Sequence, residues 1–316
     1  ERNINTMLSF QLKILIVFDG DKLPLKNNTE SNRKEARAKC FSNALQLYNQ
    51  GRTDEANKLF GQAIDITPEM AFTIKNELEK RIKKNIEFII APYEADSQLA
   101  YLSRIDYIDL VITEDSDLMV FGAKRIFYKM DKDFNGDELE ISKLSKCKEC
   151  DFSKWSNDRF IQLCVVSGCD YLNSPKGIAF KKAYQIFSTY KDIETIIENL
   201  KDKTHSTYHL DFLSAYLAFK YQVVYCPKLK ENVHLQNLPN LNDASNNSFD
   251  VDAINKTKKY KGDLEFLGKI YDKKIAIEIS ECRLDPISKR VYKNTFKVDS
   301  KVSTSHLSSN SRITNI

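Results

Sequence analysis

The sequence predicts an α/β fold with a largely parallel sheet. Apolar runs typical of buried strands lie at residues 13–20, 86–92 and 108–113, and a weaker one lies at 125–130. Segments of helical periodicity separate these runs, an alternation typical of parallel strands joined by helices. Apolar residues make up 42% of the chain and charged residues 29%, as in globular domains.

The N-terminal half combines these strands with a block of helices. The first strand ends at Gly20, and the polar segment 23–32 is expected to be a loop. Helices are then expected at 33–48, 53–66 and 68–84, the last beginning with Pro68, which suits a first helical turn. Residues 44–71 resemble one tetratricopeptide repeat, but no second copy follows to bury its face, so an inserted helical hairpin explains the same pattern.

The C-terminal half is predicted to be mostly helical from Ser156 onward. A helical segment ending in GCDYL is followed by a turn-rich stretch, NSPKGIAFKKAYQIF. A linker is expected at 240–248, and a short basic run lies at 256–261. The last ordered stretch should reach Tyr292, and the Ser-rich tail at 296–316 is expected to be disordered.

Six carboxylates stand in short motifs, most of them at the ends of the predicted strands. They are Asp19, Glu94, Asp96, Asp115, Asp117 and Asp170. The carboxyl ends of parallel strands lie at one edge of a sheet, so these side chains should converge. Like charges that close need metal ions or protons, and hard oxygen ligands select Mg²⁺ or Mn²⁺. The pattern therefore indicates a two-metal site that cleaves phosphodiesters.

The charge balance and the cysteine content give further evidence on the class of protein. The chain has 48 Lys and Arg against 44 Asp and Glu, so the surface is distinctly basic once six acids are assigned to metals. Its seven Cys residues, with no secretory signal, indicate free thiols. Cys147 and Cys150 form a C-x-x-C pair, but Cys164 and Cys169 have the wrong spacing to complete a zinc site. No apolar run approaches the ~20 residues needed to span a membrane.

In this order the motifs resemble those of the XPG-type structure-specific nucleases. They are FDG (18–20), LPLK (23–26), RK-x-x-R (33–37), APYEADSQLAYL (91–102), ITEDSDLMVFG (112–122), VSGCDYL (166–172) and GIAFKKA (177–183). The resemblance covers roughly residues 8–290, and EAD, EDSDL and GCDYL favour the exonuclease branch over the flap endonucleases. It implies a PIN-like nuclease domain at 1–150 with a helical gateway at about 27–84. A helix–two-turn–helix DNA-binding element at 151–238 and a C-terminal segment at 239–295 that packs on the core would follow.

The resemblance also implies roles for particular residues. The six carboxylates would hold two Mg²⁺ ions, with Mn²⁺ as a substitute, and Lys26, Arg33 and Arg37 would act on the scissile phosphate. The predicted DNA-binding residues are Lys34, Ser174, Lys176, Gly177, Ile178, Lys181 and Lys182, with a monovalent cation, K⁺, at the same element. The substrate would be double-stranded DNA with 5′ ends, nicks or flaps.

The implied protein is a nuclear, monomeric 5′→3′ exonuclease of DNA repair that also cleaves 5′ flaps. Mismatch-repair and sliding-clamp proteins are the partners that the resemblance suggests. A replicative flap endonuclease is one alternative, and a catalytically incomplete DNA-binding fragment is the other.

Two departures from the family pattern bear on activity. The family has a carboxylate-bearing strand upstream of FDG, so we expect the chain, which begins at Glu1, to be a fragment with little activity of its own. The family glycine at position 179 is alanine, which is tolerated only where the backbone φ is negative.

Overall fold

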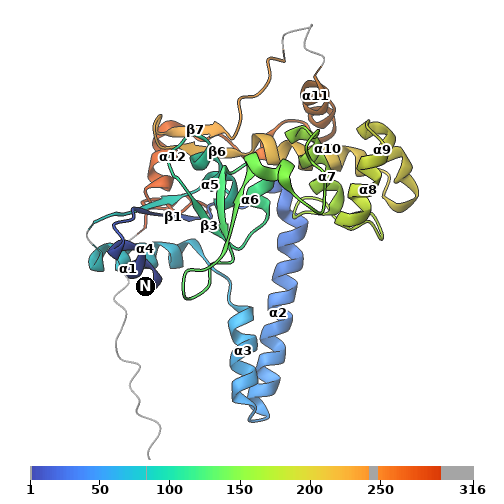
Figure 1. Cartoon of the computed structure of the whole chain (residues 1–316). Helices are drawn as coiled ribbons and strands as arrows, with labels where there is room; N and C mark the ends of the chain where they lie inside the picture. The colour runs from blue at the N-terminus through green and yellow to red at the C-terminus, as the bar shows by residue number, and fades with distance from the viewer. Residues whose placement is uncertain (1, 83, 242–247, 293–316) are drawn as a thin grey trace, which may run out of the picture.

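The computed structural model describes residues 2–82, 84–241 and 248–292. It shows a mixed α/β body from which one helical hairpin projects (Figure 1). The predicted α/β class is confirmed. The expected disordered tail at 296–316 and most of the expected linker lie outside the described residues.

Parallel strands form two separate sheets. In the first, β1 (Ile14–Phe18) pairs with β2 (Ile86–Ile90) in parallel, with Phe18 opposite Ile90. In the second, β3 (Val111–Thr113) pairs in parallel with β4 (Arg125–Tyr128), and β4 pairs antiparallel with β5 (Asp137–Glu140). The carboxyl ends of β1, β2 and β3 are the positions from which the predicted acidic motifs leave the sheets.

A helical arm projects from the body. It consists of α2 (Asn27–Asn49) and α3 (Thr53–Ala63), followed by α4 (Pro68–Arg81), whose cap is Thr67 (Figure 1). The prediction that 23–32 is a loop is wrong: Pro24–Lys26 forms a 3₁₀ turn that leads directly into α2. Polar residues are tolerated in the first turns of α2 because this part of the helix is largely solvated.

The remaining helices surround a buried central one. They are α5 (Ala95–Arg104), α6 (Asp117–Val120), α7 (Asn157–Ser167), α8 (Phe180–Thr189), α9 (Ile193–Asn199), α10 (Tyr208–Tyr221), α11 (Phe249–Lys261) and α12 (Lys273–Ser280). Every residue of α10 from Phe212 to Tyr221 is buried, as expected of a helix that is apolar on all sides. Helix α10 therefore forms the centre of the main core, against which α7 and α11 pack.

Several elements were not predicted. Helix α1 (Arg2–Ser9) precedes the first strand, β5 completes the second sheet, and β6 (Val223–Cys226) forms an antiparallel hairpin with β7 (Glu231–His234). The hairpin could not be recognised from the sequence pattern, because its buried first strand continues the apolar run of α10 without a break. Among the described residues, no helix is both long and apolar enough to cross a membrane.

Candidate active site

Two strand ends meet at Asp19 and Glu94. Asp19 follows β1, and one of its carboxylate oxygens accepts a hydrogen bond from the backbone N–H of Ala95 at 2.8 Å. Glu94 follows β2 as the residue before α5. The strand ends approach so closely that a Cβ at Gly20 would lie 1.9 Å from the carbonyl oxygen of Ala91. Only glycine fits there, which explains the G of the FDG motif.

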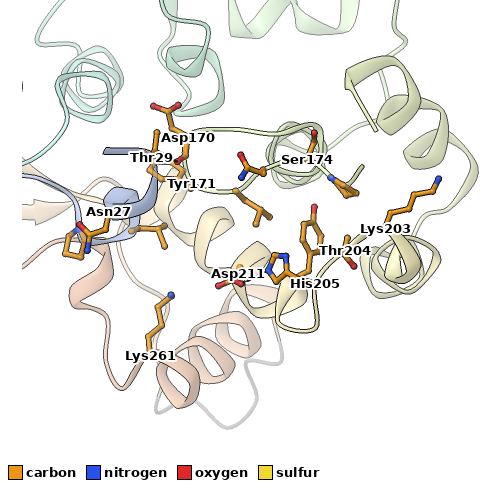
Figure 2. A pocket seen from close by; sticks show the side chains of 16 residues that line it. Asn27, Thr29, Asp170, Tyr171, Ser174, Lys203, Thr204, His205, Asp211 and Lys261 are labelled. Atoms are coloured by element: carbon orange, nitrogen blue, oxygen red, sulfur yellow. Dashed lines mark hydrogen bonds and ion pairs between the residues drawn. The ribbon is translucent and has the colours of Figure 1, made fainter. Parts of the chain in front are cut away.

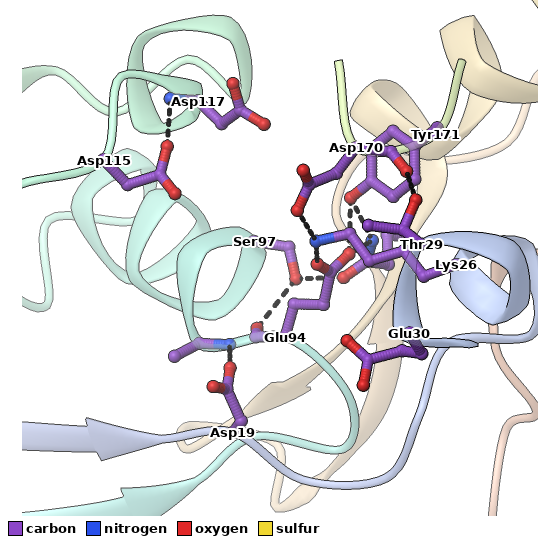
Figure 3. Close-up of polar contacts among 12 residues, drawn as sticks. Asp19, Lys26, Thr29, Glu30, Glu94, Ser97, Asp115, Asp117, Asp170 and Tyr171 are labelled. Carbon is purple, nitrogen blue, oxygen red and sulfur yellow. Dashed lines mark hydrogen bonds and ion pairs between the residues drawn. The ribbon is translucent and has the colours of Figure 1, made fainter. Parts of the chain in front are cut away.

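Asp115 and Asp117 come from the turn after β3. The Asp115 carboxylate accepts the backbone N–H of Asp117 at 2.8 Å, and the Thr113 hydroxyl accepts the N–H of Asp115 at 3.0 Å. This local turn orients Asp115 and starts the short helix α6 at Asp117. Figure 3 shows the Asp115 and Asp117 side chains to the left of Asp170, with Asp19 below all three.

Two cations at the root of the arm neutralise part of this acidic group. Lys26 Nζ contacts Glu94 and lies 3.0 Å from Asp170 Oδ2, and Arg33 donates a 2.7 Å hydrogen bond to the same Asp170 oxygen. Burial alone would lower the pKa of Lys26, but the adjacent Glu94 and Asp170 outweigh it and raise that pKa. Burial would raise the pKa of Asp170, but Lys26 and Arg33 hold it below its usual range.

Two other carboxylates, Asp96 and Asp117, have raised pKa values. Burial, with Asp115, Asp19 and Glu94 nearby, raises the pKa of Asp96 to about 7. Burial, with Asp115 and Asp170 nearby, raises the pKa of Asp117 to about 6. An acid whose pKa is raised in this way favours either a proton or a cation beside it.

The acidic group is open to solvent through a cleft. This acidic cleft has a volume of about 450 Å³. Its lining comprises Arg33, Asp115, Ser116, Asp117, Gly168, Cys169, Asp170, Asn173 and Ser174. The cleft thus places one exposed guanidinium beside three carboxylates, an arrangement that suits a phosphate held against cations.

The donor set fits hard divalent cations, although the side chains are not drawn together around one. All six predicted ligands offer carboxylate oxygen, which suits Mg²⁺ or Mn²⁺. Among the described residues, no three acidic, His or Cys side chains lie close enough to hold an ion as they stand. The raised pKa values of Asp96 and Asp117, caused first by burial and then by neighbouring acids, favour a proton or a cation beside these side chains.

A buried network that sequence reasoning missed holds Glu94. Tyr171 donates to one Glu94 oxygen, and the side-chain amide of Gln222 donates to the same oxygen at 2.7 Å. The Ser97 hydroxyl donates to the other end of the Gln222 amide at 2.5 Å, which fixes the orientation of that amide. Tyr171 belongs to the GCDY motif, so the sequence pointed to its position, whereas no motif of the sequence includes Gln222.

The structure does not bring Arg37 to the carboxylates. Arg37 lies one turn beyond Arg33 on α2, where it pairs at 3.2 Å with Asp65 from the α3–α4 connection. Lys34, on the neighbouring face of α2, is exposed. The catalytic role of Arg37 and the DNA-binding role of Lys34 stay predictions.

The segment predicted to form the helix–two-turn–helix DNA-binding element contains α7, α8 and the connection at 168–179 between them. Gly177 adopts a φ of +76° in the turn, and Ile178 is buried as an anchor. Ala179 precedes α8 with a φ of −92°, which alanine adopts without strain, so the change from the family glycine is accommodated here. Ser174, Lys176, Lys181 and Lys182 are exposed on this element. Their contacts with DNA and the K⁺ site stay predictions.

The cysteines form no disulfide, and all seven are free. Cys147 is exposed and Cys150 is half-buried. Burial raises the pKa of both Cys164 and Cys169 to about 12, so both are neutral thiols in the metal-free chain.

Comparison with known proteins gives the family. The XPG I-region matches residues 85–170, the segment from the start of β2 to Asp170 that carries five of the six acids. The chain is 33% identical over 292 residues to exonuclease 1 of Oryza sativa subsp. japonica, covering 92% of this chain and 32% of that protein. The chain belongs to the XPG-type nuclease family.

Other relatives agree with this membership. Exodeoxyribonuclease 1 of Schizosaccharomyces pombe is 35% identical over 284 residues, covering 89% of this chain and 46% of that protein. Exonuclease 1 of Arabidopsis thaliana is 37% identical over 235 residues, covering 73% of this chain and 32% of that protein. The chain thus spans about a third to a half of the length of these curated relatives.

One solved structure supports the fold. The catalytic core of Rad2, in a complex with a DNA substrate, superposes with a TM-score of 0.50 at 20% identity, covering 88% of this chain and 80% of that chain. The predicted PIN-like nuclease fold is confirmed by this likeness. Nucleases of the XPG type depend on divalent metal ions.

Proposed function

We propose that this XPG-type chain carries the nuclease region of a Mg²⁺-dependent 5′→3′ exonuclease that acts on double-stranded DNA in the nucleus during repair. The observation that carries the proposal is the pairing of Glu94 and Asp170, which come from separate motifs, with two cations at the root of the arm, beside Asp96 and Asp117, whose pKa values are raised. The names of the exonuclease relatives and the DNA-bound Rad2 core support the substrate class. Cleavage of 5′ flaps is the second activity that we propose.

Each group has a separate task in this proposal. Asp19, Glu94, Asp96, Asp115, Asp117 and Asp170 would hold two divalent ions. The bound ions would supply an activated water and support for the leaving oxygen. Arg33, whose side chain is 50% exposed, would exchange its bond with Asp170 for one with a phosphate, where its fixed charge would stabilise the transition state. Lys26, raised in pKa and mostly buried, stays protonated and limits repulsion between Glu94 and Asp170.

The exposed lysines of the α7–α8 element would anchor the duplex. Lys176, Lys181 and Lys182 would contact phosphates, which fixes the position of DNA without reading its sequence. This division assigns chemistry to the acidic cleft and duplex binding to the neighbouring element.

The test is a single-turnover assay with excess protein. Blunt, 5′-recessed and 5′-flapped duplexes labelled on either strand are incubated with Mg²⁺, with Mn²⁺ or with a chelator. The expected result is slow metal-dependent release of 5′ nucleotides that falls by at least about a hundredfold in Asp115→Asn. The control is Asp137→Asn, which removes an exposed acid from β5, a strand that β4 separates from β3.

Two outcomes would contradict the proposal. Cleavage that persists in the chelator, or that Asp115→Asn and Asp137→Asn lower equally, would remove the carboxylates from the mechanism. Release that starts from 3′ ends would contradict the polarity alone.

A further inference from the structure

The last described part of the chain packs against the first sheet. This segment, residues 265–292, contains α12 and is called the clasp below. Within the described residues the first sheet consists of β1 and β2 alone, and a pair of strands is only marginally stable without packing on its faces. Helix α12 supplies part of that packing. The buried contacts join Ala276 and Ile279 of α12 with Ile89 and Ile90 of β2.

The clasp binds the residue that precedes Glu94. The Tyr93 hydroxyl accepts the backbone N–H of Lys269 at 2.6 Å and donates to the carbonyl oxygen of the same residue at 3.2 Å. Gly268, with a φ of +104°, passes so close that a Cβ there would lie 2.3 Å from the Tyr93 ring. Only glycine fits both the space and the backbone conformation. The backbone of the clasp is therefore fixed on the side chain next to a predicted metal ligand.

The clasp also binds the second residue after Asp19. The Asp21 carboxylate lies 3.2 Å from Lys289 Nζ and accepts a bond from the Tyr271 hydroxyl at 3.4 Å. The Lys289 ammonium lies 4.2 Å from the centroid of the Tyr271 ring and donates to the carbonyl oxygen of Pro286. Three contacts thus fix this ammonium, and through it the clasp holds Asp21.

The two residues that the clasp holds are joined across the strand ends. The backbone N–H of Gly20, which lies between Asp19 and Asp21, donates to the carbonyl oxygen of Tyr93 at 2.6 Å. Asp19 is one residue from Gly20, and Glu94 is one residue from Tyr93. A shift of Asp21 or Tyr93 therefore moves the backbone that carries these two acids.

Both ends of the clasp are attached to elements around the site. Its first turn, Glu265–Leu267, packs against the 3₁₀ turn that ends at Lys26. At the other end Tyr292 stacks on Phe72 of α4, with 4.4 Å between the ring centroids. The cavity between the root of α2, the 170–175 loop and the start of α10 is lined by other parts of the chain (Figure 2), so substitutions in the clasp leave its lining unchanged.

We propose that the clasp positions the Asp19 and Glu94 carboxylates for divalent metal ions, with Tyr93 and Lys289 as its positioning residues. The inference rests on the proposed nuclease function, in which both acids hold ions. Tyr93 and Lys289 touch neither ion in this role, because they act through the backbone of neighbouring residues. Loss of the contacts that orient metal ligands typically lowers metal affinity by about 10–100-fold.

Lys289→Met separates positioning from charge. Loss of a cation near the acidic group would, through charge alone, raise Mn²⁺ affinity or leave it unchanged. Positioning predicts the opposite sign: affinity should fall by about fivefold, because Asp21 is released. Lys289→Arg keeps the charge and should stay within about twofold of the parent. Lys273→Met, which removes the same charge from the exposed start of α12, should also stay within about twofold.

Tyr93→Phe tests the other contact. It removes both bonds to Lys269 and keeps the ring, and Mn²⁺ affinity should fall by about tenfold. Tyr292→Phe is the matched control, because it removes a hydroxyl bonded at 3.1 Å to Asp285 in the same segment and keeps the stack on Phe72. Its affinity should stay within about twofold of the parent. Urea unfolding of each variant shows how much stability is lost beside the affinity.

Mn²⁺ binding is followed by electron paramagnetic resonance on the DNA-free chain, and single-turnover cleavage is measured over a range of Mg²⁺ concentrations. The cleavage defects of Lys289→Met and Tyr93→Phe should shrink as Mg²⁺ rises, because bound ions restore the positions of the acids. Tighter or parental Mn²⁺ binding in Lys289→Met, or equal losses in Tyr93→Phe and Tyr292→Phe, would overturn the proposal.

The two measurements also separate this inference from the proposed function. A parent that binds Mn²⁺ but shows no metal-dependent cleavage contradicts the proposed function, while the comparison of Mn²⁺ affinities still decides the role of the clasp. A parent that cleaves, with variants of parental Mn²⁺ affinity, contradicts the clasp alone. A parent that binds no Mn²⁺ contradicts both.

Discussion

Gln222 shows how one buried side chain can set the properties of the acidic site. It is fully buried at the end of α10, and its amide reaches Glu94 at 2.7 Å and the Tyr171 hydroxyl at 3.1 Å. Gln222→Glu would replace the donor with a carboxylate facing Glu94, whereas Gln222→Met would remove the bonds without adding charge. We expect metal-free stability to fall by about 3 kcal/mol in Gln222→Glu and by about 1–2 kcal/mol in Gln222→Met.

Metal affinity distinguishes two roles of Gln222: orienting the Glu94 carboxylate, or only filling space in the core. Mn²⁺ binding followed by electron paramagnetic resonance should weaken in Gln222→Met, because Glu94 is no longer oriented. Parental Mn²⁺ affinity in Gln222→Met, together with lower stability, would show that Gln222 acts through packing alone.

The raised pKa values of Asp96 and Asp117 predict how the stability of the chain depends on pH. The folded pKa values of about 7 for Asp96 and about 6 for Asp117 lie above the ordinary value of 3.8. Between about pH 4 and pH 7 the folded chain therefore binds more protons than the unfolded chain, so these two groups lower stability as pH rises. In a chelator, urea unfolding should give lower stability at about pH 8 than at about pH 5, and Mg²⁺ should restore more of it at the higher pH.

The matched variant is Asp96→Asn/Asp117→Asn. It keeps the shape of both side chains and removes the charge, so the decline in metal-free stability toward higher pH should become shallower. A decline as steep as that of the parent would mean that other groups cause it.

At the scale of elements, a buried charge network attaches α11 to the central helix. Lys220 of α10 is 5% exposed, and its ammonium lies 2.6 Å from Asp250 of α11 and 2.7 Å from Asp158 of α7. The Tyr216 and Tyr221 hydroxyls also donate to Asp250, at 2.7 and 2.6 Å. Lys220→Met should destabilise the chain by about 3 kcal/mol, because it leaves Asp250 as a charge in a largely buried site.

Lys256→Met is the control for this prediction. It removes a lysine from the same α11, but its partner Asp252 and the lysine itself are about half exposed, so the cost should stay below about 0.5 kcal/mol. Urea denaturation of both variants compares them directly. Similar losses would show that burial does not strengthen the Lys220 network.

The elements that the sequence predicted well are those with a strong local period. The strands before Asp19, Glu94 and Asp115 were predicted from apolar runs. The approach of Asp19 to Glu94 follows from the parallel pairing of β1 with β2, whereas Asp115 leaves the second sheet. The role of Gln222 could not be predicted from the sequence, because its contact with Glu94 joins residues 128 positions apart and forms only when α10 is buried. Arg37 has the spacing of a catalytic cation on the helix, but it pairs instead with Asp65 of the α3–α4 connection.

At the scale of the whole molecule, two groups of cations flank the acidic cleft and should have different effects. Arg33 bonds to Asp170 inside the site, whereas Lys182 is exposed on α8. Arg33→Ala should lower single-turnover cleavage by more than about tenfold while DNA affinity changes by less than about threefold, because its charge acts on the transition state.

Lys182→Ala should show the opposite balance, because it removes a phosphate contact that exists equally before and during the reaction. DNA affinity should fall, cleavage of the bound complex should stay near the parental rate, and the slope of log affinity against log salt should become shallower by about 0.9.

Lys143→Ala is the control, since Lys143 is already bonded at 2.5 Å to Glu140 beyond the second sheet. Titrations at several salt concentrations, followed by single-turnover cleavage at saturating protein, measure both quantities on the same duplex. If Arg33→Ala and Lys182→Ala reduce affinity and cleavage in the same proportion, the molecule has one continuous basic surface, and the proposed separation of chemistry from duplex anchoring is wrong.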